Sequence, residues 1–131
     1  MYLERGTKNV KKKMLNKLTE EPDNYEEVGY WRKANQIHGW FVDNVMNGED
    51  KCKRYKVTEE QLKLLLEVVN IVLNNHDLAE EYLPPREGFM FGDYEVDEEY
   101  FEYLEETKQI LELVFKGTNF KTQEITYLPS W

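Results

Sequence analysis

Residues 58–74 read Thr-Glu-Glu-Gln-Leu-Lys-Leu-Leu-Leu-Glu-Val-Val-Asn-Ile-Val-Leu-Asn. Thr58 and Gln61 have the spacing of a capping box, in which each side chain binds the backbone of the other residue. We therefore predict a helix that begins after Thr58 and ends near Asn74. Its periodicity gives two apolar faces: Leu62, Leu65, Leu66, Val69, Val72 and Leu73 on one, and Leu64, Val68 and Ile71 on the other. A helix that is apolar on several sides is expected to be central in its domain, or buried against another subunit.

The segments around this helix predict shorter elements. Residues 7–19 are typical of a basic helix, about residues 25–45 of a second helix, and residues 97–115 of a further helix with the aspartate as its N-cap. Residues 122–128 alternate and predict one strand, which could pair with residues 89–92. The predicted fold is a single, mainly α domain of the α+β class. It has about four helices and a small two-stranded β element.

The charge of the chain is unevenly distributed. The 131 residues carry a formal net charge of −9, yet residues 1–20 contain six cations and only two carboxylates. We divide the chain into a basic N-terminal helix or arm, residues 1–24, and a helical ligand-binding and oligomerisation domain, residues 25–131. A nucleic-acid polymer would require a broad basic face, which this composition does not provide. An anionic ligand must therefore be small, or the partner must be basic.

The composition also bears on location. No apolar run approaches the roughly 18 residues that cross a bilayer, and the N-terminal segment lacks the apolar core of a secretory signal. Cys52 is the only cysteine, which excludes an internal disulfide and suits a reducing cytoplasm. We expect a cytoplasmic protein with no membrane contact.

Residues 30–42 are the most informative stretch for function. If they are helical, one face carries Trp31, Asn35, His38 and Val42, and the adjacent face carries Tyr30, Ala34, Ile37, Phe41 and Val45. We expect the second face to be core. The first face has two interpretations. It is either a helix edge whose polar side chains bind backbone carbonyls, or it is the wall of a ligand site.

The second interpretation assigns roles to specific side chains. Trp31 or Trp40 would stack on a planar ring, which contributes about 1–3 kcal/mol per base. Arg32 and Lys33 would hold phosphate, the arginine through a bidentate fork. The side chains that could read base edges are Asn35 and His38.

A second cluster reads Pro84-Pro85-Arg86-Glu87-Gly88-Phe89-Met90-Phe91-Gly92. Its glycines allow close backbone approach, and Phe91 is a further candidate for stacking. Arg86 lies among many carboxylates, so it forms either a salt bridge or a phosphate clamp.

Catalytic and metal sites are not supported by the sequence. His38 and His76 are not part of a ligand-spaced pair, and Cys52 has no CxxC companion. No phosphate-binding glycine motif or nucleophile elbow is present. We predict a protein that is not an enzyme and has no catalytic residues, no metal and no cofactor.

The acidic residues of the predicted 97–115 helix and its approach give an alternative from another class. They are Glu95, Glu98, Glu99, Glu102, Glu105 and Glu106. Such a row can imitate a phosphate backbone, so the chain could be an acidic nucleic-acid mimic that inhibits a host defence protein. The simpler interpretation is a solvated helix face. A structural adaptor without a small ligand is a third hypothesis.

Four segments of the chain are distinctive. They are Tyr30-Trp31-Arg32-Lys33-Ala34-Asn35-Gln36-Ile37-His38 with Trp40-Phe41; Leu83-Pro84 followed by Gly88-Phe89-Met90-Phe91-Gly92; Glu98-Glu99-Tyr100-Phe101-Glu102 with Leu104 and Thr107; and a closing Ile125 to Trp131. Over about residues 25–131 the chain thereby resembles a widespread family of small tailed-phage proteins.

This family resembles the anti-CBASS sponge proteins of bacteriophages. The resemblance implies a non-enzymatic homo-oligomer in the host cytoplasm that sequesters cyclic dinucleotide alarm signals, such as 3′,3′-cGAMP, and so serves immune evasion. A cyclic dinucleotide presents two bases and two phosphates, which suits the candidate rings and cations. Its symmetry suits a pocket at a two-fold interface of a dimer or tetramer. We expect the helix at residues 58–74 to form that interface.

Overall fold

An antiparallel sheet organises the computed structural model, which describes residues 1–7, 25–32, 34–49, 51–85 and 96–129. In the described residues the sheet has four strands in the order β2-β1-β4-β3. The strands are β1 (Tyr2–Thr7), β2 (Glu26–Tyr30), β3 (Tyr55–Val57) and β4 (Gln123–Leu128). The predicted two-stranded element is therefore wrong, although the strand predicted at residues 122–128 is confirmed. Its partners are β1 and β3, and residues 89–92 lie outside the described part of the chain.

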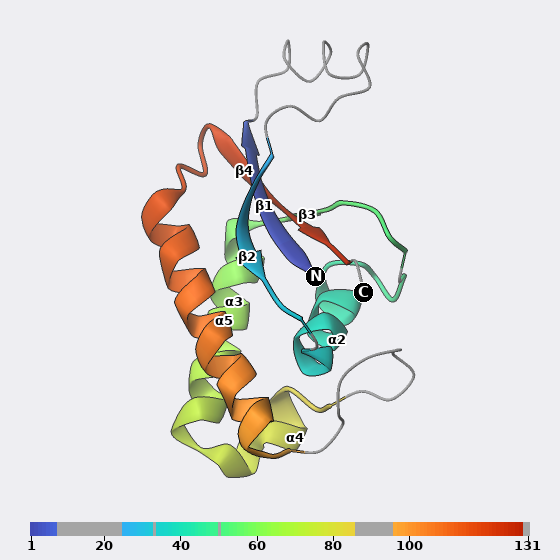
Figure 1. Ribbon diagram of the computed structural model, residues 1–131, viewed down its shortest axis with the longest axis vertical. Helices are drawn as coiled ribbons and strands as arrows, with labels where there is room; N and C mark the ends of the chain where they lie inside the picture. The colour runs from blue at the N-terminus through green and yellow to red at the C-terminus, as the bar shows by residue number, and fades with distance from the viewer. Residues whose placement is uncertain (8–24, 33, 50, 86–95, 130–131) are drawn as a thin grey trace.

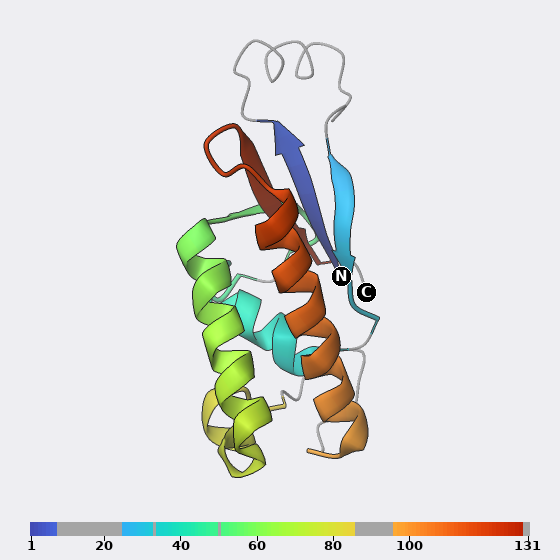
Figure 2. The ribbon, with the colours of Figure 1, turned by 90° about the vertical axis from the view of Figure 1, so that its left-hand side faces the viewer.

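Helices α3 and α5 lie side by side against the sheet (Figure 2). The helical elements are α2 (Asn35–Asn44), α3 (Glu59–Asn74), the 3-10 turn η1 (His76–Leu78), α4 (Ala79–Tyr82) and α5 (Glu98–Gly117). Helix α2 lies near the end of the sheet at which β1 begins (Figure 1). None of the described helices is long and apolar enough to span a bilayer.

Two helix starts are confirmed at the level of single hydrogen bonds. The Thr58 hydroxyl accepts from the Gln61 N–H at 3.1 Å, and the Gln61 side chain accepts from the Thr58 N–H at 2.9 Å, which completes the capping box of α3. The Asp97 carboxylate accepts from the Tyr100 N–H at 3.0 Å and caps α5. Local side-chain chemistry fixes both starts, so the sequence alone could predict them.

The helix predicted at about residues 25–45 is wrong in its first part. Residues 26–30 form strand β2, and the helix begins only at Asn35. Strand β2 pairs with β1 and also touches α5, where a Cβ on Gly29 would lie 2.5 Å from Cγ2 of Ile110. Glycine is therefore needed for this close approach of strand and helix. Trp31 precedes α2 and does not share a helical face with His38.

The predicted N-terminal arm, residues 1–24, is described only in part. Residues 2–7 form β1, which lies between β2 and β4 in the sheet. Leu3 of β1 is fully buried, and the guanidinium of Arg5 binds both Glu26 and the Gly117 carbonyl. The start of the predicted arm is thus part of the sheet. The basic helix predicted at residues 7–19 lies, apart from Thr7, outside the described residues.

Tyr100 joins α5 to the segment that follows α4, and it gives a first testable prediction. Its hydroxyl donates to the buried Leu83 carbonyl at 2.6 Å, and burial raises the pKa of this phenol above its ordinary value. We expect Tyr100→Phe to lower the free energy of unfolding at neutral pH by about 1–2 kcal/mol. A raised pKa in the folded state also means that stability falls as pH rises above about 10, the unfolded value.

Urea denaturation of both proteins at neutral pH and near pH 11 would measure these effects. The loss of stability with pH should be smaller in Tyr100→Phe than in the wild type. Equal losses would show that Tyr100 is not a group that controls alkaline unfolding. Tyr82→Phe is the matched control, because this tyrosine lies at the end of α4 and is 42% exposed.

Candidate functional site

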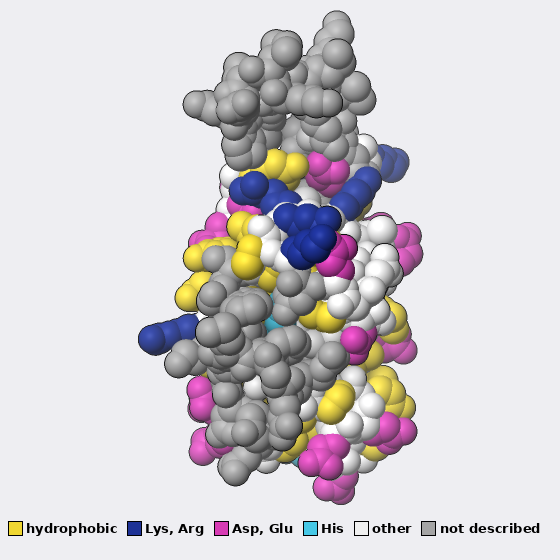
Figure 3. Space-filling model, turned by 90° about the vertical axis from the view of Figure 1, so that its right-hand side faces the viewer, with side chains coloured by type: hydrophobic (Ala, Val, Ile, Leu, Met, Phe, Trp, Pro, Cys, Tyr) yellow, Lys and Arg dark blue, Asp and Glu magenta, His cyan; other side chains and the backbone are white. Residues whose placement is uncertain are grey.

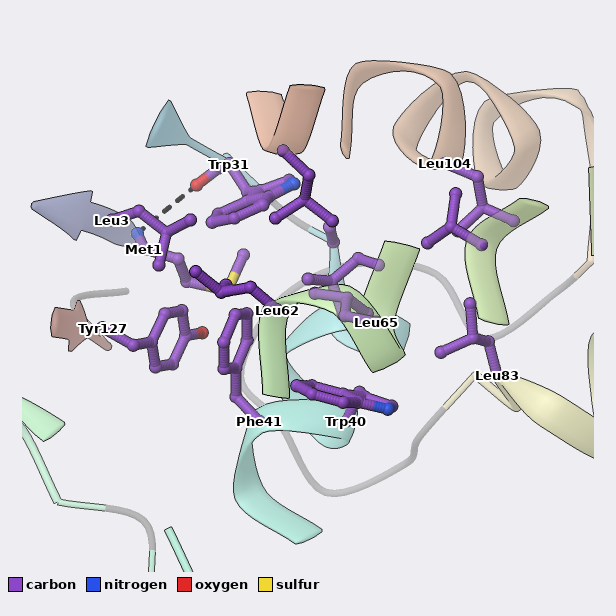
Figure 4. Packing of buried hydrophobic residues seen from close by; sticks show 14 of the residues in the cluster. Met1, Leu3, Trp31, Trp40, Phe41, Leu62, Leu65, Leu83, Leu104 and Tyr127 are labelled. Atoms are coloured by element: carbon purple, nitrogen blue, oxygen red, sulfur yellow. Dashed lines mark hydrogen bonds between the residues drawn. The ribbon is translucent and has the colours of Figure 1, made fainter. Parts of the chain in front are cut away.

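Trp31 is a core residue in the structure. Its side chain is fully buried, and its indole N–H donates to the Thr107 hydroxyl at 2.8 Å. The ring lies edge-on to Phe41 and Tyr127, and these three rings pack together with Leu62 and Met1 (Figure 4). A ring with no exposed surface cannot stack on a ligand in this conformation. The structure therefore places Trp31 in the core of the fold, where its neighbours occupy the space a ligand would need.

The two residues predicted to read base edges are also buried. His38 Nδ1 lies 2.7 Å from the Tyr127 hydroxyl, and no surface of the imidazole is exposed. Asn35 is similarly enclosed at the first position of α2. One partner of His38 is thus a side-chain hydroxyl inside the protein. In this conformation both side chains face the protein interior.

Trp40 lies at the boundary between core and surface. Its side chain is 7% exposed and borders a small pocket of about 80 Å³, which α2 forms with the end of α4. Tyr82 and Pro84 also line this pocket. The volume is far below the roughly 300–1,000 Å³ of typical ligand pockets. Trp40 therefore has access to a space large enough for a small group only.

Arg32 is the predicted site residue that the structure exposes. It lies two residues after the end of β2 and borders a groove of about 420 Å³ between β2 and α5. We call this the β2–α5 groove, and it is lined by Tyr30, Arg32, Tyr103, Glu106, Gln109, Ile110 and Leu113. The other candidates, Lys33, Arg86 and Phe91, lie outside the described residues.

Charged side chains of both signs surround Tyr103, the tyrosine that α5 contributes to the groove. Burial and the neighbouring Glu99 carboxylate raise the pKa of Tyr103, Glu106 acts in the same direction, and Arg32 opposes them. The Tyr103 hydroxyl donates to the Glu99 carboxylate at 3.2 Å. At neutral pH the phenol is therefore protonated. The groove combines one guanidinium with acceptor groups and neutral rings.

The two tyrosines of the groove were not among the predicted ligands. We had assigned Tyr30 to a core face, but it lies in the edge strand β2 and is 49% exposed. Tyr103 lies on α5 between exposed glutamates, a position that indicates a surface residue. That signal was available in the sequence, whereas the exposure of Tyr30 depends on the pairing of β2 with β1.

Lysine and arginine side chains gather on another part of the surface, the side shown in Figure 3. The segment before and within β3 contributes Lys51, Lys53, Arg54 and Lys56. Each of them lies within 4.0 Å of a carboxylate, from Glu49, Glu4 or Glu124. Because these cations are already paired within the chain, they are poorer candidates than Arg32 for holding a phosphate.

A further pocket of about 260 Å³ lies at the start of α3. Phe120 and Ile125 contribute apolar walls, and Glu59, Glu60 and Glu124 contribute carboxylates. Across the described residues, no cluster of three histidine, cysteine or acidic side chains has a geometry that could hold a metal ion. The acidic lining makes this pocket unfavourable for an anion.

Comparison with protein families, with curated proteins and with solved structures finds no match for this chain.

Proposed function

We propose that this chain is a phage immune-evasion protein that binds a cyclic dinucleotide in the β2–α5 groove and sequesters it without hydrolysis. The observation that supports the proposal is the grouping of Arg32 with Tyr30 and Tyr103 around one groove. The resemblance of the chain to the anti-CBASS sponge proteins supplies the class of ligand. Under this proposal the protein acts in the host cytoplasm and lowers the free concentration of the alarm signal.

The chemistry of the groove suits the parts of such a ligand. Arg32 presents a planar fork that matches two phosphate oxygens, and this contact is stronger than one made by a point charge. Tyr30 and Tyr103 offer rings on which bases stack. Gln109 can donate to and accept from a base edge, and Glu106 can accept from amino groups. The volume of about 420 Å³ falls within the range of typical ligand sites.

One structural observation favours a second candidate function. The outer side of α5 exposes a row of carboxylates, consisting of Glu98, Glu99, Glu102, Glu105, Glu106 and Glu112. This row is consistent with the acidic nucleic-acid mimic, which would inhibit a basic host protein. The mimic predicts no binding of any nucleotide and capture of a basic partner, so the two functions are separable by one titration.

The test is a recovery experiment with 3′,3′-cGAMP. Purified protein is titrated with the nucleotide by calorimetry, the complex is separated from free ligand, and the protein is then heat-denatured. We expect saturable binding and release of chemically intact nucleotide, measured by chromatography. Recovery of a linear or monomeric product would show an enzyme instead. An absence of binding to every cyclic dinucleotide tested would refute the sponge proposal.

A further inference from the structure

Two exposed apolar side chains lie beside the groove. Leu113 is 66% exposed and Tyr30 is 49% exposed, the highest values among the large hydrophobic residues of the described chain. Both border the β2–α5 groove together with Ile110. Protein interfaces are enriched in aromatic and arginine side chains, and their energetic centres often contain tyrosine and arginine. Tyr30, Arg32 and Leu113 therefore form a surface suited to another protein.

A strand edge lies on the same side of the molecule. Strand β2 is at one end of the sheet order, and in the described part of the chain it pairs with β1 alone. Gly29 brings β2 into direct contact with Ile110 of α5, so the strand edge and the helix are neighbours (Figure 2). Unpaired N–H and C=O groups of an edge strand favour pairing with another chain. We call this combined surface the β2–α5 face.

We propose that a second copy of this chain docks on the β2–α5 face, with the two α5 helices antiparallel across a two-fold axis. The charge pattern of α5 supports this occupant and this direction. At the three- and four-residue spacing of one helical side, α5 carries Glu99, Glu102, Glu106, Gln109, Leu113 and Lys116. The N-terminal half of this side of α5 is thus acidic, and its C-terminal half is apolar and basic.

In an antiparallel arrangement the acidic half of one α5 lies opposite the half of the other α5 that carries Lys116. In a parallel arrangement carboxylates lie opposite carboxylates. With the axis near Gln109, Glu102 of each copy faces Lys116 of the other. The contact is isologous, so one patch serves both partners and the assembly closes as a dimer. Like-charge pairing across an interface costs several kcal/mol, which disfavours the parallel alternative.

The β2–α5 face is a better candidate for the interface than α3. Leu62, Leu65 and Val69 of α3 are buried within their own chain, and Leu64 is its most exposed leucine at 46%. The 20 residues of α5 span about 30 Å. A contact along this length is at the lower end of the size of stable interfaces. We therefore expect a dimer that dissociates on dilution.

A cross-linking experiment tests the register. In a Cys52→Ser background, which removes the native thiol, Gln109→Cys places one thiol per chain near the proposed axis. Mild oxidation should give a covalent dimer on a non-reducing gel, whereas Lys63→Cys on α3 should give little. Equal yields from the two positions, or none from Gln109→Cys, would overturn the proposed register.

A dissociation experiment tests the face. We expect Leu113→Glu to raise the dimer dissociation constant about 30-fold or more, measured by light scattering over a concentration series. Leu64→Glu is the matched control and should leave the dimer intact. Circular dichroism should show the same fold in both variants, because both side chains are exposed. A wild type that is monomeric at all concentrations would overturn the inference. Neither experiment uses a nucleotide, so both report on the dimer alone. The β2–α5 face includes residues that line the β2–α5 groove, so a ligand in the groove would lie between the two copies. A protein that dimerises but binds no nucleotide would count against the proposed function only.

Discussion

Replacing Trp31 by alanine is expected to lower the free energy of unfolding by about 3–5 kcal/mol, as is typical for removal of a large buried aromatic side chain. The indole is fully buried, and its removal leaves a cavity beside the Phe41 and Tyr127 rings. It also removes the donor to the Thr107 hydroxyl. Guanidinium denaturation followed by circular dichroism would measure the change. Since the expected loss is a large part of a typical domain stability, much of the variant could be unfolded at 37 °C.

Trp31→Phe separates packing from hydrogen bonding at the same position. It retains an aromatic ring and loses the N–H donor, so we expect a smaller loss, of about 1–3 kcal/mol. Leu64→Ala serves as a surface control, because this leucine of α3 is 46% exposed, and it should change stability by less than about 0.5 kcal/mol. A Trp31→Ala variant of wild-type stability that no longer bound nucleotide would contradict the structure and restore Trp31 as a ligand contact.

Replacing Arg32 by alanine is expected to weaken binding of 3′,3′-cGAMP about 10- to 100-fold. The reason is the loss of a charge-assisted, bidentate contact to phosphate, which contributes about 1.5–3 kcal/mol. Arg32 is exposed at the groove, so its removal should leave stability nearly unchanged. Calorimetric titration of wild type and variant under the same salt conditions would measure the effect.

Two further variants make the result specific. Arg54→Ala removes the same charge from the segment before β3, outside the groove, where Arg54 pairs with Glu4, and it should bind like the wild type. Arg32→Lys keeps the charge but loses the planar fork, so we expect intermediate affinity. If Arg32→Ala and Arg54→Ala weakened binding equally, the effect would be one of overall charge, and the groove would not be the binding site.

The parts of the fold that the sequence could predict depend on local chemistry. The capping box at Thr58, the aspartate cap at Asp97 and the β-branched residues before Leu128 each lie in or beside the element they define. Strands β1 and β2 do not have such a signal. Their pairing joins Leu3 to Gly29 and is therefore set by tertiary contacts. A helical period that fits residues 31–42 does not show where the helix begins.

The candidate site could be predicted only in part for the same reason. The cationic character of Arg32 is visible in the sequence, and its exposure follows from its place after an edge strand. A helical period over residues 30–42 places Trp31 on one face with Asn35 and His38, and one interpretation makes that face a ligand wall. Once β2 ends at Tyr30, the chain directs Trp31 inward and leaves Arg32 at the surface. Neighbouring residues thus have opposite environments.

The pairing of β1 with β4 has a consequence for synthesis on the ribosome. Tyr2 lies opposite Leu128, so β1 is synthesised well before β4, the strand that occupies its second edge. Contacts between such distant positions slow folding, because a long loop must close before they form. While translation continues, β1 remains an open template for aggregation or for chaperones. The emerging polypeptide should therefore acquire protease resistance only after β4 has left the exit tunnel.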